Sequence, residues 1–329
     1  MLMNMNGTIL VTGGAGYIGN SVVSELINTS SVKKIVIFDN FSKARAEAIS
    51  KILRNEKIIL IPGEKADIRD AKNVEEAIKQ HAPETIIHLA AKLENFTKDR
   101  EGKDIETEQI NHIATTQMAE IAKRSGVKNF IFQSTASIYK AGPGIKEDDE
   151  KQPQYAYAKS KLSAEEDLLK LADDSFRVAI LRPASVAGYN SSFRYETMLN
   201  IMCLRAVYKI PINIFKSAME VKKSTLSVND DARAIVFALN NIEQISKIPL
   251  NVSSFDCTLK EVLDLLIESE GNSFPYIIVE EETAKDRVYT LNTEKIKGFG
   301  FEPKDTLRET ILKTVKMLKK RKALEETQL

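Results

Sequence analysis

Short hydrophobic runs alternate with longer amphipathic segments through the first half of the chain. The runs predict strands, because they are rich in Ile, Val, Leu and Phe and are bounded by turn residues. They cover residues 9–11, 35–39, 58–61, 85–89, 129–133 and 177–182. Apolar residues at helical spacing predict helices over 18–27, 42–54, 71–80, 105–125 and 156–172. Such alternation is typical of an α/β fold, a doubly wound parallel (Rossmann) sheet with helices on both faces.

The regular alternation ends after Gly188. We expect Asn229 or Asp230 to cap a helix over 231–241, because their side-chain oxygens can accept hydrogen bonds from its first N–H groups. The lysines of the last helix are expected to form a solvated face. The remaining patterns in this half predict helices over 193–208, 258–269 and 305–324, and a short strand over 225–228.

A glycine-rich turn follows the first predicted strand, at Gly13, Gly16 and Gly19. In a strand–turn–helix unit the first glycine permits a sharp turn and the second lets a pyrophosphate approach the backbone. The third lets the helix pack closely on the strand. The N-terminus of the helix offers unpaired N–H groups and a partial positive charge to phosphates. We count Tyr17 and Ile18, at this end, among the cofactor-binding residues. This stretch therefore predicts a dinucleotide-binding site.

The second strand ends in Asp39, about 20 residues past the last glycine, where a carboxylate binds the adenosine ribose hydroxyls. A carboxylate here repels a 2′-phosphate, so NAD is favoured over NADP. Lys43 and Arg45 follow closely and keep NADP open as an alternative. We count Asn40, the next residue, among the cofactor-binding residues.

The fourth strand ends in the small residues Ala90 and Ala91, which let the backbone lie against a cofactor. Together with Leu89 they form a further predicted cofactor contact. His88 lies within the same strand. A histidine at the end of a buried strand is more often a hydrogen-bonded core residue than a ligand, and we interpret His88 in that way.

The change of pattern after the sixth strand divides the chain into two regions. Residues 1–185 form the predicted NAD-binding Rossmann domain, and 224–254 return to it. Residues 186–223 and 255–329 form a smaller substrate-binding region, where we expect specificity to reside.

Composition excludes several other classes of protein. The 329 residues include 47 basic and 46 acidic ones, so the chain has no electrostatic footprint for nucleic acid or an anionic membrane. Cys203 and Cys257 have no paired spacing, which indicates a reducing, cytoplasmic compartment without disulfides or a zinc site. No apolar run is long enough for a transmembrane helix, and residues 1–6 lack the features of a signal peptide. We expect no bound metal.

Two Tyr-x-x-x-Lys pairs overlap in one predicted helix, Tyr155/Lys159 and Tyr157/Lys161. An offset of two residues rotates the second pair by about 200°, so only one pair can face the protein. The face of the second pair continues through apolar residues, Ala164, Leu168, Leu171 and Ala172. The face of the first continues through polar ones, Ser163, Glu166, Lys170 and Asp173. We therefore choose Tyr157 and Lys161 as catalytic residues.

A tyrosine acts as a base near neutral pH only if its pKa falls from about 10, at about 1.36 kcal/mol per unit. A unit charge at about 4 Å and an effective dielectric of about 20 supplies on the order of 4 kcal/mol. Lys161 and the positive nicotinamide ring are therefore sufficient to make Tyr157 a base. Thr135, just beyond the fifth strand, can hydrogen-bond the same substrate oxygen.

These motifs resemble the extended short-chain dehydrogenase/reductase superfamily, and within it the NAD-dependent sugar-nucleotide epimerase/dehydratase group. The resemblance covers nearly the whole chain. It is carried by Thr12–Gly19, Asp39-Asn40, Asp67-Ile68, His88–Ala91, Asn111, Ser134–Ala136, Tyr157–Leu162, Leu181–Pro183 and the segment around Asp230.

The resemblance implies roles for residues that the pattern alone does not assign. Asp67 and Ile68 are implied to flank the adenine, and Asn111 to support the active-site network. Pro183 and Ser185 are implied to lie near the nicotinamide. The helices over 105–125 and 156–172 are implied to form the interface of a homodimer.

The chain also departs from the pattern of the group. Dehydratases usually carry an acid just after the catalytic Ser or Thr, whereas this chain has Ala136 and Ser137. Ser185 stands where 4-epimerases often carry Asn. The substrate-phosphate arginine appears as Lys222 or Lys223, which lacks the fork of an arginine.

Two further positions bear on the substrate. Ser227-Val228 replaces the usual His-Val before the acidic pair. Arg287 is a loosely aligned candidate for a second phosphate contact, so we predict Lys223 and Arg287 as substrate-binding residues.

Three hypotheses follow for the function. The first is an NAD-dependent nucleotide-sugar epimerase, most similar to the UDP-glucose 4-epimerases, that works through a transient keto-sugar and retains its cofactor. The second is a reductase or dehydrogenase that acts on another carbonyl or alcohol with an exchangeable cofactor. The third is a non-enzymatic NAD-binding scaffold. We prefer the first, with a small-molecule substrate and no nucleic-acid or membrane partner.

Overall fold

The computed structural model describes residues 7–43, 46–93, 101–271, 274–280 and 288–327. The chain packs as two compact units. The first unit comprises Met1–Lys140, Glu150–Arg182 and Ala232–Leu250. The second comprises Ala141–Asp149, Pro183–Asp231 and Asn251–Leu329. The packing therefore changes unit at 182/183, three residues before the boundary expected from the sequence, and the returning segment is shorter than 224–254.

A seven-stranded sheet forms the centre of the first unit, in the order β10-β6-β5-β4-β1-β2-β3. The strands are β1 (Thr8–Thr12), β2 (Lys34–Asp39), β3 (Ile58–Pro62), β4 (Thr85–His88), β5 (Asn129–Gln133), β6 (Arg177–Pro183) and β10 (Pro249–Val252). The pairings from β6 to β3 are parallel. All residues of β1 and β5 are buried, as expected of strands covered on both faces. The predicted doubly wound fold is confirmed, and its strand order reverses between β1 and β4.

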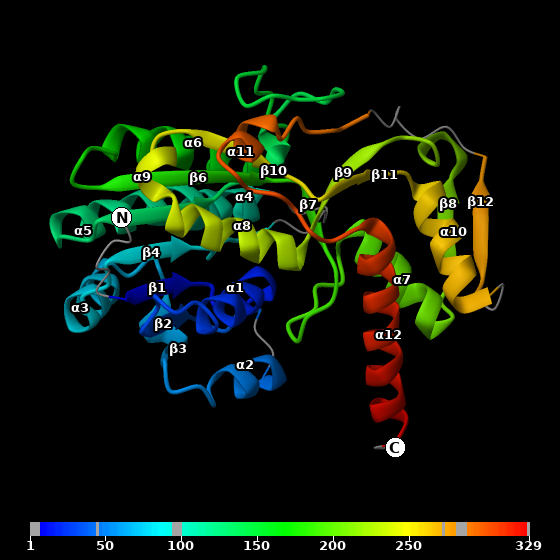
Figure 1. The fold of residues 1–329 in the computed structure, drawn as a ribbon, viewed down its shortest axis with the longest axis horizontal. Helices are drawn as coiled ribbons and strands as arrows, with labels where there is room; N and C mark the ends of the chain where they lie inside the picture. The colour runs from blue at the N-terminus through cyan, green and yellow to red at the C-terminus, as the bar shows by residue number, and fades with distance from the viewer. Residues whose placement is uncertain (1–6, 44–45, 94–100, 272–273, 281–287, 328–329) are drawn as a thin grey trace. The chain divides into compact units, whose positions relative to one another are not determined.

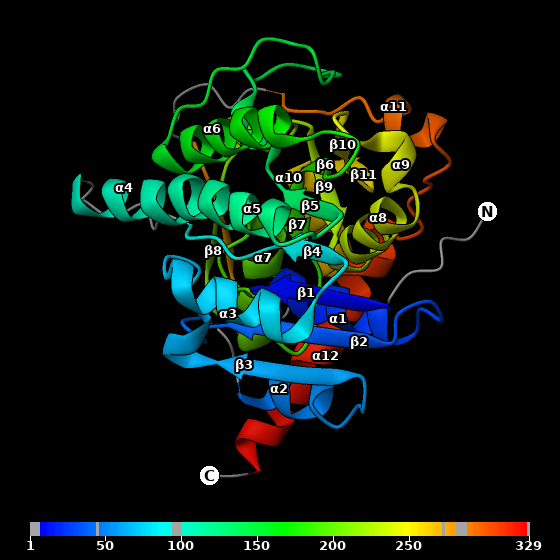
Figure 2. The same ribbon diagram turned by 90° about the vertical axis from the view of Figure 1, so that its left-hand side faces the viewer.

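Helices cover both faces of this sheet. Figure 2 shows α3, α5 and α6 on one face and α1, α8 and α9 on the other. The helices are α1 (Tyr17–Ile27), α2 (Ala46–Ile52), α3 (Ala71–His81), α4 (Glu101–Glu108), α5 (Thr115–Arg124), α6 (Ala156–Leu171), α8 (Val228–Asn240) and α9 (Ile242–Ile245). Short 3₁₀ turns occupy Gly63–Ala66 and Ala136–Ile138.

Three local features of the chain differ from the sequence prediction. The helix expected over 105–125 begins at Glu101 and contains a π-helical turn, Gln109–Ala114, between α4 and α5. The helix expected over 42–54 is the shorter α2, although residues 44–45 lie outside the described part of the chain. Strand β10, at the edge of the central sheet, was not predicted.

The predicted cap of α8 is wrong. The helix already begins at Val228, and the Ser227 hydroxyl accepts a hydrogen bond from the Asp230 N–H group at 2.9 Å. Asp230 lies inside the first turn, where its carboxylate accepts from the Lys304 N–H group at 2.8 Å and from the Ser254 hydroxyl at 2.7 Å. Asp230, Ser254 and Lys304 all belong to the second unit, so the acid fixes loop residues of its own unit instead of the helix end.

The second unit contains a three-stranded sheet in the order β11-β9-β7 and a parallel pair, β12-β8. Three of its helices, α7 (Met198–Tyr208), α10 (Leu259–Glu270) and α12 (Leu307–Glu326), lie beside one another (Figure 1) and contribute to a separate hydrophobic core. The strands are β7 (Ser185–Ala187), β8 (Ile212–Phe215), β9 (Lys223–Ser227), β11 (Phe255–Cys257) and β12 (Tyr276–Val279). The helices are α7 (Met198–Tyr208), α10 (Leu259–Glu270), α11 (Glu294–Gly298) and α12 (Leu307–Glu326), with a 3₁₀ turn at Lys216–Ala218.

Capping boxes at Thr258 and Thr306 begin α10 and α12, close to the predicted starts of these helices. In contrast, α7 begins five residues later than predicted, and of the strands in this unit only β9 was predicted.

Cys203 and Cys257 are buried and unpaired. No helix within the described part of the chain is both long and apolar enough to cross a membrane.

Candidate active site

The glycine-rich turn between β1 and α1 has the close contacts that its spacing predicts. Gly13 has a φ of +65°, and a Cβ atom there would lie 2.8 Å from the backbone nitrogen of Ala90. A Cβ atom on Gly19 would lie 2.6 Å from Cα of Gly14, so the helix packs directly on the turn. At Gly16 a Cβ atom would meet only the Gly13 carbonyl oxygen, at 3.2 Å. Backbone thus leaves no room for a side chain at Gly13 and Gly19, and at Gly16 a Cβ atom would have one tight contact, with the turn's own carbonyl oxygen.

Helix α1 begins with features that suit a phosphate. Gly16 is its N-cap residue, and no side chain caps its first N–H groups. The first turn, which includes Tyr17 and Ile18, carries no acidic residue. An anion at this end would meet the positive end of the helix dipole.

Asp39, the last residue of β2, is tied to this turn. One carboxylate oxygen accepts from the Ala15 N–H group at 2.9 Å, and the other accepts from the Phe41 N–H group at 2.8 Å. Burial raises the pKa of Asp39, and the N–H groups of Phe41, Ala15 and Gly16 oppose that shift. The acid therefore sits beside the turn, as a ribose-binding carboxylate requires.

Asn40, next to it, is exposed, and its amide oxygen accepts from the Ser42 N–H group at 3.1 Å. Lys43 is also exposed, whereas Arg45 lies outside the described residues.

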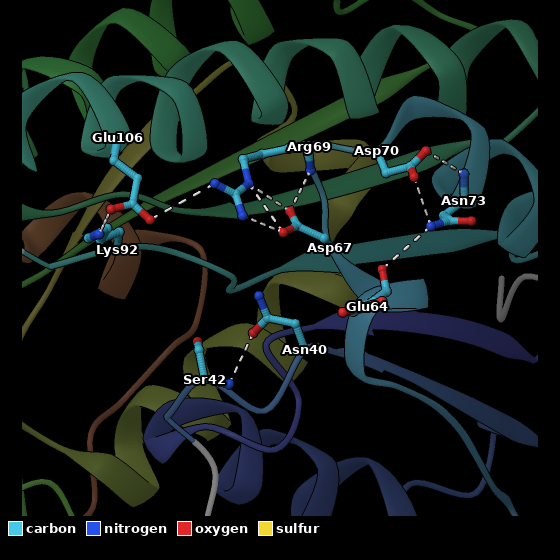
Figure 3. A network of polar contacts seen from close by, with 9 residues as sticks. All are labelled: Asn40, Ser42, Glu64, Asp67, Arg69, Asp70, Asn73, Lys92 and Glu106. Carbon is cyan, nitrogen blue, oxygen red and sulfur yellow. Dashed lines mark hydrogen bonds and ion pairs between the residues drawn. The ribbon is translucent and has the colours of Figure 1, made fainter. Parts of the chain in front are cut away.

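Beyond β3, Asp67 belongs to a chain of charged side chains that the sequence did not predict (Figure 3). Arg69 binds the Asp67 carboxylate through Nε at 3.0 Å and Nη2 at 2.5 Å, which lowers the pKa of Asp67. Arg69 also lies 3.9 Å from Glu106, and Glu106 forms an ion pair with Lys92. The next residue, Ile68, is buried in the hydrophobic core of the first unit.

The end of β4 is fixed by Thr12. Its hydroxyl oxygen accepts from the N–H groups of Leu89 and Ala90, both at 3.1 Å, and lies 3.0 Å from Nδ1 of His88. Leu89 and Ala90 are half-buried and Ala91 is exposed, so this segment presents backbone at the carboxyl edge of the sheet.

His88 is fully buried, and its Nε2 lies 2.9 Å from the Thr115 hydroxyl. Because Thr12 accepts two N–H bonds, its own proton goes to Nδ1 of His88, and Nε2 donates to Thr115. Burial and the nearby Lys161 charge lower the pKa of His88 to about 3. The interpretation of His88 as a hydrogen-bonded core residue is confirmed.

The two Tyr–Lys pairs of α6 occupy different environments, as the stripes of apolar and polar residues predict. Tyr155 is the N-cap residue, with 48% of its surface exposed, and Lys159 is exposed. Tyr157 is half-buried, and Lys161 is only 2% exposed, with Nζ 4.2 Å from the centre of the Phe132 ring. Burial lowers the pKa of Lys161 to about 7, with Glu165 opposing the shift.

Thr135 lies just beyond β5 and is 7% exposed. Its hydroxyl oxygen accepts from the Ser137 N–H group at 3.1 Å and donates to the Ser137 hydroxyl at 3.2 Å. These bonds begin the 3₁₀ turn at Ala136, so the hydroxyl group has a fixed place. Ser137 itself is exposed.

Asn111 connects the π-helical turn to the same region. Its amide oxygen accepts from the Lys92 N–H group and its amide nitrogen donates to the Lys92 carbonyl oxygen, both at 2.8 Å. The amide nitrogen also donates to the Ser160 hydroxyl at 3.3 Å. Ser160 precedes Lys161, so the structure brings Asn111 to the buried face of α6. Lys92 and Ser160 were not predicted as site residues.

A buried ion pair fixes the same face of α6 on the sheet. Nε and Nη2 of Arg182, on β6, donate to Glu165 Oε2 at 3.0 and 2.6 Å, and Nη1 donates to the Tyr139 hydroxyl at 2.7 Å. Arg182 and Glu165 are 3% and 1% exposed. The sequence contains one signal for this ion pair, an arginine at the end of an apolar strand. A charge in that position is buried and therefore needs a partner of opposite charge.

Four predicted residues lie outside the first unit or outside the described residues. Pro183, Ser185 and Lys223 belong to the second unit, and Arg287 is not among the described residues. Their predicted contacts with cofactor or substrate therefore remain predictions.

Comparison with known proteins places this geometry in a family. A model of the NAD dependent epimerase/dehydratase family matches residues 9–253. The UDP-glucose 4-epimerase of Rhizobium leguminosarum bv. trifolii is 26% identical over 328 residues, which cover 92% of this chain and 95% of the relative. The dTDP-glucose 4,6-dehydratase of Haemophilus influenzae is 24% identical and covers 94% of this chain and 96% of its own.

Among solved structures, the UDP-glucose 4-epimerase of the hyperthermophilic eubacterium Thermotoga maritima, crystallised with UDP-glucose, aligns with a TM-score of 0.81. It is 26% identical and covers 96% of this chain and 99% of its own. The resemblance inferred from the motifs and the prediction of NAD as cofactor are confirmed by the family match, and the chain belongs to the NAD dependent epimerase/dehydratase family.

Proposed function

We propose that this protein is an NAD-dependent nucleotide-sugar epimerase that acts on a UDP-sugar through a transient keto-sugar. The observation that carries the proposal is the placement of Tyr157 and Lys161 on the buried face of α6, on a sheet whose glycine-rich turn and Asp39 suit a dinucleotide. The relatives favour an epimerase over a general reductase, since the relatives from Rhizobium leguminosarum and Thermotoga maritima are UDP-glucose 4-epimerases.

The residues that would hold NAD are those around the turn and the adjoining strand ends. They are Gly13, Gly16, Tyr17, Ile18, Gly19, Asp39, Asn40, Asp67, Ile68, Leu89, Ala90, Ala91, Asn111, Lys161, Pro183 and Ser185. When bound, NAD supplies a hydride acceptor that returns the hydride to the sugar. The fit rests on the close backbone contacts at the glycines of the turn, the uncapped start of α1 and the carboxylate of Asp39 beside the turn.

Tyr157 takes the proton from the sugar hydroxyl that is oxidised and returns it when the keto group is reduced. Lys161, one helical turn later, favours the tyrosinate because a buried cation interacts strongly with a neighbouring anion. Thr135 redirects the hydrogen bond that it donates to Ser137 toward the same substrate oxygen, and the bond from the Ser137 N–H group keeps its hydroxyl oxygen in place.

The residues after Thr135 favour epimerisation over the elimination of water. A dehydratase needs an additional acid, but Ala136 is a buried apolar residue and Ser137 carries a hydroxyl group. This point matters because a dTDP-glucose 4,6-dehydratase also matches nearly the whole chain. We assign substrate recognition to the second unit, with Lys223 and Arg287 as contacts for the phosphates.

We also propose that the protein is a cytoplasmic homodimer. Ile105 and Ile113, on the helical stretch from Glu101 to Arg124, are 58% and 55% exposed, although they are large apolar residues. A partner that packs against this stretch and α6 would remove them from water. The two buried, unpaired cysteines suit a reducing compartment.

The test uses the purified protein with UDP-glucose, UDP-N-acetylglucosamine or UDP-glucuronate and no added cofactor. We expect one of them to give its epimer, resolved by chromatography, because the cofactor is regenerated in each turnover. Tyr157→Phe should lower the rate by about 10²–10⁴-fold, and the matched variant Tyr155→Phe should leave it unchanged. Turnover seen only with added NAD or NADP and another carbonyl compound would overturn the epimerase proposal in favour of a reductase.

A further inference from the structure

The helix from Glu101 to Arg124 is interrupted by one π-helical turn, Gln109–Ala114. A π-helical turn is rare and usually persists only where other contacts hold it, often at a functional site. Adjacent residues of this turn, Asn111 and His112, both form side-chain contacts with α6. The contacts of Asn111 with Lys92 and Ser160 fix one side of the turn.

His112 fixes the other side. Its Nδ1 lies 2.6 Å from a carboxylate oxygen of Glu108, one turn earlier, and its Nε2 lies 2.8 Å from a carboxylate oxygen of Asp167 on α6. An ionised carboxylate only accepts hydrogen bonds, so both ring nitrogens must donate. The two contacts are therefore made together only by the protonated imidazolium.

The charges around His112 favour that form. Among the described residues, Glu108 faces it from its own helix, and Asp167 faces it from α6 together with Lys170, which donates to the other oxygen of Asp167 at 2.9 Å. Burial opposes the charge, but the hydrogen bonds with Asp167 and Glu108 outweigh burial and raise the pKa of His112 above its ordinary value.

We propose that His112 is a positioning residue, which clamps the π-helical turn between Glu108 and Asp167 and so holds Asn111 against Ser160 beside Lys161. The effect on turnover rests on the proposed function, whereas the clamp itself does not. Loss of the proton breaks at least one of the two contacts. The π-helical turn is then free to shift. The Asn111 amide, which bonds to Lys92 and Ser160, shifts with it.

The clamp can be tested without any substrate. The chain has three histidines, so each imidazole can be followed by NMR during a pH titration. His88 has its pKa lowered to about 3, and burial lowers the pKa of His81, so a single imidazole should titrate above the ordinary value of about 6.5. That signal should be absent in His112→Gln, and its pKa should fall in Asp167→Asn. Titration of His112 at or below its ordinary pKa would overturn the proposal.

The positioning role is tested by steady-state kinetics on the same variants. The matched control is Asp173→Asn, which removes the charge of another carboxylate that pairs with α5, the partner of Lys123 at 2.5 Å in the turn that follows α6, away from the π-helical turn. We expect His112→Gln and Asp167→Asn to lower kcat about tenfold with little change in KM, since small misplacements of site groups reduce rates strongly. The control should stay within about twofold.

The pH profile separates positioning from a general structural effect. Wild-type kcat should fall as pH rises through the pKa of His112 read from the NMR titration, and this part of the fall should be absent in His112→Gln. The part that follows the titration of Lys161 should remain in both proteins. Equal kinetic losses in the variants and the control would overturn the proposal. If the wild-type protein epimerises no UDP-sugar, the proposed function is wrong. The NMR titration, together with the amount of NAD that each variant retains, then still tests whether His112 clamps the π-helical turn.

Discussion

Helix α6 has two faces that carry the same pair of residue types in opposite environments. On the inner face Lys161 is 2% exposed and the neighbouring Glu165 is buried. On the outer face Tyr155 is 48% exposed, and Lys159 lies in solvent. The comparison shows that residue type and spacing do not decide what a Tyr–Lys pair can do. A charge on the inner face interacts with its neighbours several times more strongly than the same charge in water.

The largest difference between the two faces should appear in catalysis. We expect Lys161→Met to lower kcat by about 10²-fold or more, because it removes the cation that favours the Tyr157 anion. Lys159→Met removes the same group from the outer face and should leave kcat within about twofold. The measurement is the initial rate of epimerisation of a UDP-sugar for both variants at equal protein concentration.

Both variants should have the circular dichroism spectrum of the wild-type protein, so that a loss of rate is not a loss of fold. Equal rates for Lys161→Met and Lys159→Met would contradict the assignment of the inner face as catalytic.

The next difference concerns stability. Glu165→Gln leaves the Arg182 guanidinium buried without its counter-ion, and removing one partner of such a pair costs about 3–5 kcal/mol. Glu166→Gln, one residue along on the outer face, should leave the unfolding midpoint in urea unchanged. Urea unfolding followed by circular dichroism measures both.

A double variant sharpens this result. Replacing both charges, in Glu165→Leu with Arg182→Met, should recover much of the lost stability, because well-packed apolar residues often replace a buried pair without cost. A double variant less stable than Glu165→Gln would indicate that the bond from Arg182 to the Tyr139 hydroxyl carries the stabilisation instead.

The sequence predicted those parts of the molecule that depend on local patterns. The glycine spacing and Asp39 follow one strand–turn–helix unit, so they could be located without knowing any distant contact. The choice between the two Tyr–Lys pairs required only the helical period and the polarity of the residues that follow. His88 was interpreted correctly because a buried strand end leaves a histidine few other options.

The sequence could not predict features that depend on distant partners. The π-helical turn at Gln109–Ala114 leaves the hydrophobic pattern almost unchanged, and its supports, Lys92 and Asp167, lie far away in the sequence. The cap of α8 was misassigned because Asp230 bonds to residues 254, 304 and 305. Most strands of the second unit were missed because they are short and their pairing is not sequential.

The inner face should also give stability a dependence on pH. Burial lowers the pKa of Lys161 to about 7 in the folded protein, whereas the unfolded chain has the ordinary value of about 10.4. Between these two pKa values the unfolded chain binds more protons than the folded protein. Lys161 therefore raises the free energy of unfolding by about 1.4 kcal/mol for each unit by which the pH increases. Urea unfolding of NAD-free protein between about pH 7 and pH 9 measures the slope.

Other groups titrate in the same pH range, so the contribution of Lys161 to this slope is obtained by comparing variants. Lys159→Met should keep the wild-type slope, and Lys161→Met should lose this part of it. A slope that is the same in both variants would mean that Lys161 remains charged in the folded protein.

The smallest effect is expected on the outer face, at the pair of Lys170 with Asp167. Lys170 is exposed, and its bond to Asp167 competes with water, so Lys170→Ala should leave the midpoint of thermal unfolding unchanged within about 1 °C. The same change removes a cation from Asp167 and leaves that carboxylate to His112. The pKa of His112 should therefore stay the same or rise slightly in an NMR titration. A fall in that pKa would show that Lys170 holds Asp167 in place for His112, and the outer face would then take part in positioning the site.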